Sequence, residues 1–92
     1  MTATLTTSLQ DRIRAAYAAL ATRCGQWIGL LELRAELAGV DRAEMDRALR
    51  MLGRQEGVVI IPESNQKTLT PADRDAAVVI GDQPKHLISI WD

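Results

Sequence analysis

The feature of this sequence that most constrains its fold is a pair of short amphipathic segments joined by only a few residues. Within residues 30–37, Leu30, Leu33 and Leu37 lie three and four positions apart, a spacing that places them on one face of a helix. Residues 41–56 begin with a capping-box pattern at Asp41 and carry a second apolar stripe at helical spacing. Two helices joined so tightly cannot lie antiparallel and bury both stripes unless a third helix covers them.

The preceding residues supply that third helix. Ser8 and Asp11 have the capping-box spacing, in which a serine hydroxyl accepts from a backbone N–H three residues on, so a helix should begin directly after Ser8. Apolar residues at helical spacing continue it to about Arg23, and Gly25 can adopt the left-handed conformation that closes a helix. With residues 26–29 as a brief strand or extended turn, this order predicts a helix-turn-helix core.

The chemistry of the chain changes after Gly57. Residues 58–61 are all valine or isoleucine, which favour a strand, and residues 62–66 favour a turn. Residues 67–69 can return as a second strand. We therefore predict a β-hairpin over residues 58–69, directly after the third helix.

A C-terminal extension is predicted from about Pro71 onward. Thr70 has the capping-box spacing to Asp73, and Pro71 suits the first position of a further short helix. Residues 81–84 break that helix, and residues 86–91 predict a final strand. The fold class is therefore α+β, with a short helix and a strand after the hairpin.

Length and composition indicate one soluble globular domain. The chain has 92 residues, of which 47% are hydrophobic and 25% charged, so we expect a single domain over residues 8–92 after a flexible N-terminus at residues 1–7. No apolar run approaches the ~20 residues that span a bilayer. Residues 1–10 also lack the pattern of a secretory signal, so we expect a cytoplasmic protein.

The sequence offers no pattern of catalytic or metal-binding residues. Cys24 is the only cysteine, which excludes an internal disulfide and leaves a zinc site without enough ligands. The order and spacing of serine, histidine and acidic residues give no nucleophile elbow, phosphate loop or paired carboxylates. We expect no enzyme activity, no metal and no cofactor. Cys24 and Trp27 are expected to be buried, and His86 to have a structural role.

The order helix, short strand, helix, tight turn, helix and hairpin resembles the winged helix-turn-helix family over roughly residues 8–70. Trp-Ile-Gly-Leu at residues 27–30, followed by Leu33 and Leu37, is similar to the strand and second helix of that family. Arg-Ala-Leu-Arg-Met-Leu and then Gln-Glu-Gly-Val-Val, within residues 41–59, are similar to its third helix and the step into its wing.

This resemblance implies a small DNA-binding transcriptional regulator. In that family the third helix enters the major groove, and the wing touches the neighbouring phosphates. Here the helix is residues 41–56 and the wing is the hairpin at residues 58–69. Arginine suits such contacts because its planar fork can donate twice to guanine or clamp a phosphate. The residues that would face DNA are Arg42, Ala43, Asp46, Arg47 and Arg50 on the helix, with Gln66 and Lys67 on the wing.

Charge is where this chain departs from the family. The net charge is −1, and four arginines between Asp41 and Gly57 are matched by four acidic residues. A monomer with so few unopposed cations should bind DNA weakly at physiological salt, whereas a homodimer would double the contacts. The alternative for these arginines is a solvated helix face with intrahelical pairs, such as Asp46 with Arg50.

The sequence leaves open where the apolar residues of the tail, residues 76–91, are packed, and which function the fold serves. They either pack internally, with Trp91 covering the first helix, or form the face of a homodimer. The alternative function is a protein-interaction or adaptor module of the same fold, in which the third helix or the last strand docks onto a protein partner and DNA is not bound.

Overall fold

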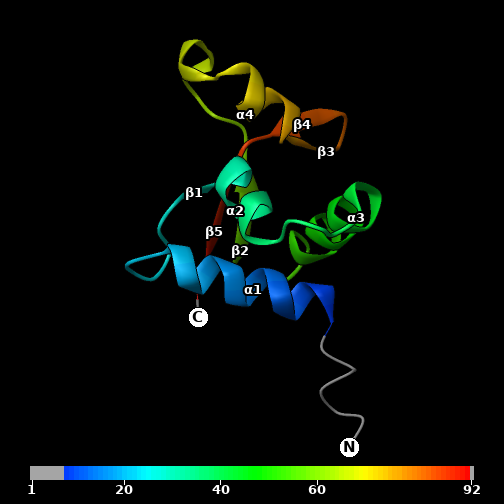
Figure 1. The fold of residues 1–92 in the computed structure, drawn as a ribbon. Helices are drawn as coiled ribbons and strands as arrows, with labels where there is room; N and C mark the ends of the chain where they lie inside the picture. Colours follow the sequence, from blue (N-terminus) through cyan, green and yellow to red (C-terminus); the bar gives the residue numbers. More distant parts are fainter. Residues whose placement is uncertain (1–7, 92) are drawn as a thin grey trace, which may run out of the picture.

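Three main helices begin where the sequence predicts them in the computed structural model, which describes residues 8–91 (Figure 1). They are α1 (Leu9–Leu20), α2 (Leu30–Glu36) and α3 (Arg42–Leu52). The first ends at Leu20, before the predicted end near Arg23, because the backbone is already extended at Ala21. None of the helices within residues 8–91 is long and apolar enough to cross a membrane. With two small antiparallel sheets, the helices make a compact α+β fold. The segment predicted to be flexible, residues 1–7, lies outside the described residues.

Side-chain caps fix where α1 and α3 begin. The Ser8 hydroxyl accepts a 3.1 Å hydrogen bond from the Asp11 N–H. One carboxylate oxygen of Asp41 accepts from the N–H groups of Ala43 and Glu44 at 3.1 and 3.2 Å. Each bond satisfies a backbone donor that has no partner within its helix. Both predicted helix starts are therefore confirmed.

α3 ends at Leu52, before the predicted end at residue 56. Beyond Leu52 the backbone tightens, because the N–H groups of Arg54 and Gln55 donate to carbonyls only three residues back. Gly57 then adopts a φ of +87°, a conformation that suits glycine and that directs the chain into the next strand.

The main sheet has three antiparallel strands in the order β1–β5–β2. β1 (Ile28–Gly29) and β2 (Val58–Ile61) flank β5 (Leu87–Ile90). Ile88, opposite Ile28 on one side and Ile60 on the other, is fully buried. The predicted final strand is therefore confirmed, and it is the central strand of the sheet, paired along both edges.

The predicted hairpin over residues 58–69 is wrong. β2 pairs with β5, and residues 67–69 form no strand. Gln66–Thr68 is instead a short 3₁₀ turn, η2. At its start the Lys67 N–H donates to the Asn65 side chain. The central strand of a sheet is covered on its core face and hydrogen-bonded on both sides. The apolar Leu87–Ile90 segment meets that requirement better than the exposed, polar segment around Lys67.

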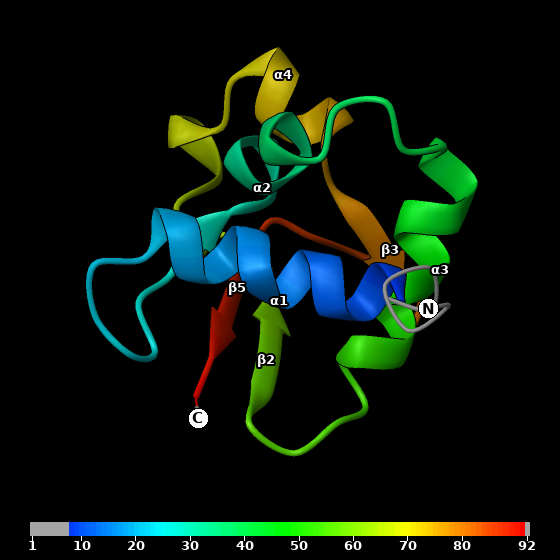
Figure 2. The same ribbon diagram turned by 60° about the horizontal axis from the view of Figure 1, so that its bottom comes forward.

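The connection between β2 and β5, residues 62–86, is a folded excursion of its own. After η2 come α4 (Pro71–Asp75) and then an antiparallel hairpin of β3 (Val78–Ile80) and β4 (Gln83–Lys85). In Figures 1 and 2 this excursion runs past α2 toward α3, and β3 packs against α3. We call the β3 and β4 unit the inserted hairpin.

α4 begins with the predicted capping box. The Thr70 hydroxyl accepts from the Asp73 N–H at 3.1 Å, and the Asp73 carboxylate accepts from the Thr70 N–H at 3.0 Å. The backbone and side-chain hydrogen bonds from Thr70 hold the pKa of Asp73 below its ordinary value, with a smaller contribution from nearby His86. α4 ends at Asp75 and does not continue toward Val78, because Val78 enters the inserted hairpin.

The core lies between the three main helices and the main sheet. Its members are mainly aliphatic side chains from every layer, together with Tyr17 and Met45. The largest fully buried aliphatic ones are Ile13, Leu30, Leu33, Leu49, Leu52, Ile88 and Val78. Val78 belongs to β3, so the inserted hairpin is anchored in the same core rather than projecting from it. The apolar surplus of the C-terminal tail is therefore largely packed internally.

Candidate nucleic-acid interface

The exposed side of α3 presents a row of basic side chains. The buried side of this helix consists of Met45, Ala48, Leu49 and Leu52. Spacings of four, three and four residues place the opposite row on one face of the helix and its continuation. That row is exposed and consists of Ala43, Arg47, Arg50 and Arg54. We call these four residues the outer row of α3.

Three residues predicted to contact DNA, Ala43, Arg47 and Arg50, lie on this outer row. Within residues 8–91, the Arg47 guanidinium has no hydrogen-bond or ion-pair partner, and neither does that of Arg54. The intrahelical pair between Asp46 and Arg50, which their spacing allows, does not form; Asp46 pairs with other arginines. The outer row is therefore cationic, with no carboxylate bound to it in the described part of the chain.

Two other predicted contact residues, Arg42 and Asp46, turn toward the excursion. Arg42 Nη2 donates to the carbonyl oxygens of Asp75 at 2.6 Å and Ala77 at 3.0 Å. Asp46 accepts from Arg34 at 2.6 Å and from Arg42 at 3.4 Å. Arg42 thus ties α3 to the end of α4 and the residues after it, and Asp46 ties α3 to Arg34 of α2, so both side chains are engaged in holding the fold together.

Arg50 belongs to the exposed outer row but is also bound to the inserted hairpin. Its Nε–H donates to the Val79 carbonyl at 2.9 Å, which fixes the guanidinium against the inserted hairpin. Its two terminal nitrogens have no hydrogen-bond partner within residues 8–91, and the side chain is exposed. Arg50 is therefore positioned by the fold and keeps donors for a ligand.

The two residues predicted as wing contacts lie elsewhere. Gln66 and Lys67 are in η2, where the Gln66 side chain donates to the Glu63 carbonyl at 2.5 Å. The Arg74 side chain on α4 donates to the Gln66 carbonyl at 3.0 Å. Both views place this turn across the molecule from α3 (Figures 1 and 2). The structure does not bring these two residues together with the outer row.

Sequence reasoning missed two basic residues beside α3. Arg54 continues the outer row four residues after Arg50, and this spacing could have identified it. Lys85 on β4 lines the same hollow as Arg50 and Arg54. No sequence signal pointed to Lys85, because its position depends on the inserted hairpin packing against α3.

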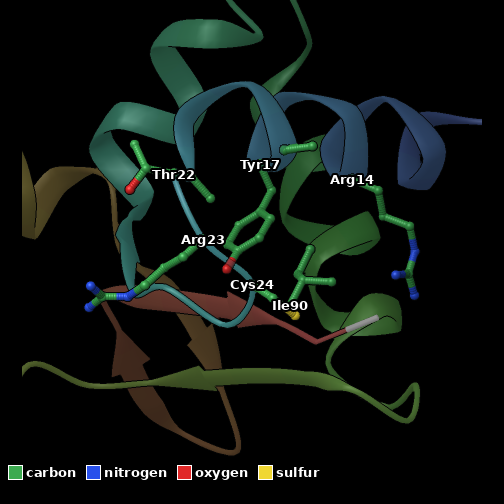
Figure 3. A pocket seen from close by; sticks show the side chains of 8 residues that line it. Arg14, Tyr17, Thr22, Arg23, Cys24 and Ile90 are labelled. Carbon is green, nitrogen blue, oxygen red and sulfur yellow. The ribbon is translucent and has the colours of Figure 1, made fainter.

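A second hollow, of about 380 Å³, lies beside the C-terminal end of α1. It is lined by the last turns of α1, the loop after it and Ile90. Figure 3 shows Tyr17, Cys24 and Ile90 near its centre, with Arg14 and Arg23 pointing toward opposite ends.

Cys24 is exposed, so its expected burial is wrong: it lies in a surface loop beyond the end of α1. Among residues 8–91, no group of three histidine, cysteine or acidic side chains could hold a metal ion.

The two tryptophans and the histidine have different surroundings. Trp27 is 46% exposed, so its expected burial in the core is also wrong; it precedes β1 rather than covering α1. His86 is buried, and its Nδ1 accepts a 3.0 Å hydrogen bond from the Glu63 N–H, which confirms a structural role. Trp91 is 57% exposed, and its N–H donates to the Gly57 carbonyl at 2.7 Å.

The Trp91 ring lies directly against the backbone of Gly25. Gly25 has a φ of +76°, and a Cβ there would lie 2.5 Å from ring atoms of Trp91. We predict that Gly25→Ala destabilises the protein more than the matched change Gly39→Ala. Gly39 also has a positive φ, +98°, but a Cβ there would meet nothing within 4 Å. Urea unfolding should show a loss of about 1–2 kcal/mol for Gly39→Ala from backbone strain alone, and a larger loss for Gly25→Ala. Equal losses would contradict close packing of the ring.

Comparisons of this chain with protein-family models, with curated proteins and with solved structures give no match. The candidate interface is therefore defined by its own geometry: a cationic outer row on α3, flanked by an inserted hairpin that carries Lys85.

Proposed function

We propose that this chain is a winged-helix protein that binds double-stranded DNA with α3 in the major groove. The order α1, β1, α2, α3, β2, β5 and the sheet order β1–β5–β2 support this assignment. The excursion between β2 and β5 occupies the place of the wing, so the inserted hairpin takes over the role first expected of residues 58–69. In this arrangement the protein acts by occupying a DNA site, as a small transcriptional regulator does.

The observation that carries the proposal is the cationic outer row of α3. An α-helix of 11 residues is about 16 Å long, and the major groove is about 12 Å wide, so α3 can enter it. Arg47, Arg50 and Arg54 would then point toward base edges and phosphates. Ala43 offers a small apolar surface of the kind that contacts a thymine methyl group.

The overall charge of −1 does not oppose this proposal, because the charges near α3 are segregated. Asp46 is neutralised by Arg34 and Arg42, on the side of α3 that faces the excursion. Asp41 is engaged as the N-cap. The carboxylates on this helix thus leave the outer row unopposed, apart from the exposed Glu44 at its edge.

The test is the affinity of the full chain for a labelled mixed-sequence duplex as a function of salt. We expect measurable binding at low salt and a log–log slope that reflects a few neutralised phosphates. Light scattering of the complex gives the number of chains bound per duplex. Absence of binding at low salt to this duplex and to a pool of genomic fragments would refute the proposal.

A second candidate function is a protein-interaction module that does not bind DNA. It is favoured by exposed apolar side chains beside the outer row: Met51 on α3 is 50% exposed and Val79 on β3 is 48% exposed. Apolar groups next to arginine are common in protein interfaces. Partner capture that persists after charge reversal on the outer row, in a chain that never binds duplex, would favour this second function.

A further inference from the structure

A hollow of about 260 Å³ lies between the end of α3 and the inserted hairpin. Three basic side chains line it: Arg50, Arg54 and Lys85. Ile60 and Ile80 provide apolar walls, and no acidic side chain among residues 8–91 lines the hollow. Two chain segments far apart in sequence therefore bring three cations around one concave surface.

The donors of this hollow are partly fixed and partly unused. Arg50 is held by its Nε–H bond to the Val79 carbonyl, so its terminal nitrogens are oriented without a ligand. Lys85 Nζ donates to the Gln83 side chain at 3.0 Å, which leaves two of its three donors. The Arg54 guanidinium has no partner in residues 8–91. The hollow thus offers several donors from three directions to one acceptor group.

This chemistry suits a phosphate oxyanion. Three cations close together repel one another, and an anion between them removes that repulsion. A phosphate group presents several acceptor oxygens, whereas a carboxylate presents two in one plane, so donors from three directions match a phosphate better. The apolar walls exclude water on one side, which strengthens the charge-assisted hydrogen bonds.

We infer that this hollow seats one backbone phosphodiester of the duplex that α3 enters. The inference rests on the proposed function and adds to it a specific phosphate contact at the junction of α3 and the inserted hairpin. Lys85 then supplies the backbone contact that the sequence assigned to Lys67. Because Arg50 is anchored to Val79, this seat is formed before DNA arrives.

The test uses the full chain and a 20-bp fluorescein-labelled duplex over a salt series, with the variants Arg54→Gln, Lys85→Gln and both together. Arg50 is left intact because its bond to Val79 also holds the fold. Each single change should weaken binding by about three- to tenfold at low salt. If both side chains hold the same phosphate, the double variant should lower the slope of log K against log salt by about one, rather than about two.

The matched control is Arg23→Gln, the same loss of charge in an exposed loop beyond the far end of α1. It should keep the wild-type affinity and slope. If the duplex binds but the two pocket variants match the wild type, the phosphate seat is refuted while the proposed function stands. A slope change of about two for the double variant would refute a single shared phosphate. No duplex binding by the wild type would refute both proposals.

A free phosphate is distinguished from a backbone phosphate by titration with inorganic phosphate alone, followed by NMR of the Arg54 Nε–H and Lys85 Nζ signals. We expect only weak, unsaturated shifts, because the seat is open on one side and holds a phosphate mainly when the rest of the duplex is bound. Saturable submillimolar binding that is lost in Lys85→Gln would overturn the assignment to DNA backbone and indicate a free-phosphate site.

Discussion

Replacing Arg47 with glutamate is expected to weaken duplex binding by roughly 10- to 100-fold at low salt. Arg47 is exposed at the middle of the outer row and has no partner within the described residues, so the change removes a free cation without breaking a contact of the fold. Glutamate at this position also repels the phosphates. Fluorescence anisotropy with the labelled duplex measures the loss, and circular dichroism checks that the helix content is unchanged.

The control for Arg47→Glu is Arg23→Glu, which makes the same charge change in the loop beyond α1. Both variants lower the net charge from −1 to −3, so a difference between them reports position rather than overall charge. If the two variants weaken binding equally, DNA is attracted by general electrostatics and α3 is not the contact helix. If neither has an effect on a duplex that does bind, DNA contacts another face of the protein.

The parts of the fold that the sequence predicted well depend on local interactions. Ser8, Asp41 and Thr70 each cap a helix that begins at the next residue, and a cap needs only a side-chain acceptor two or three residues from its donor. The final strand was also recognisable, because Leu87–Ile90 contains two β-branched isoleucines and follows the turn-forming residues 81–84. These signals lie within a few residues of the elements that they define.

The errors concern pairings between distant segments. The partner of Val58 is Ile90, and no local signal distinguishes that partner from the nearer residues 67–69. The inserted hairpin was missed for a related reason: Gly81 and Asp82, with φ of +60° and +63°, form its turn, and the sequence was interpreted only as breaking α4. Such pairings depend on which strand gains most from burial in the complete fold.

The same limit applies to the candidate site. Arg42, Arg47 and Arg50 all lie on α3, and spacing alone gave them similar roles. The excursion gives them different surroundings, because Arg42 donates to carbonyls such as that of Ala77 whereas Arg47 is left exposed. Lys85 joins the site only through the packing of β3 on α3. The spacing of the sequence predicts α3 and its row of arginines, but not which of these arginines are bound within the fold and which are left exposed.

That division can be tested at Arg34, the residue that connects α2, α3 and the excursion. Its side chain is only 14% exposed, and it donates to Asp46 and to the Ala76 carbonyl, both at 2.6 Å. Removing one partner of such a pair leaves the other charge poorly solvated and an acceptor without its donor. Arg34→Met, which keeps an apolar stem, should therefore lower the free energy of unfolding by about 2–4 kcal/mol.

Urea denaturation followed by circular dichroism measures this loss, and the comparison variant is Arg42→Met. Arg42 shares Asp46 but is 50% exposed, so its ion pair should contribute under about 1 kcal/mol. The double variant Arg34→Met with Asp46→Leu should recover part of the stability, because it also removes the half-buried carboxylate whose closer partner is lost. A release of the inserted hairpin should also appear as faster hydrogen exchange at Val79 and a reduced salt slope of duplex binding, since Lys85 moves with that hairpin. If both variants lose less than about 1 kcal/mol, neither arginine holds the excursion, and the apolar contacts of Val78 hold it instead.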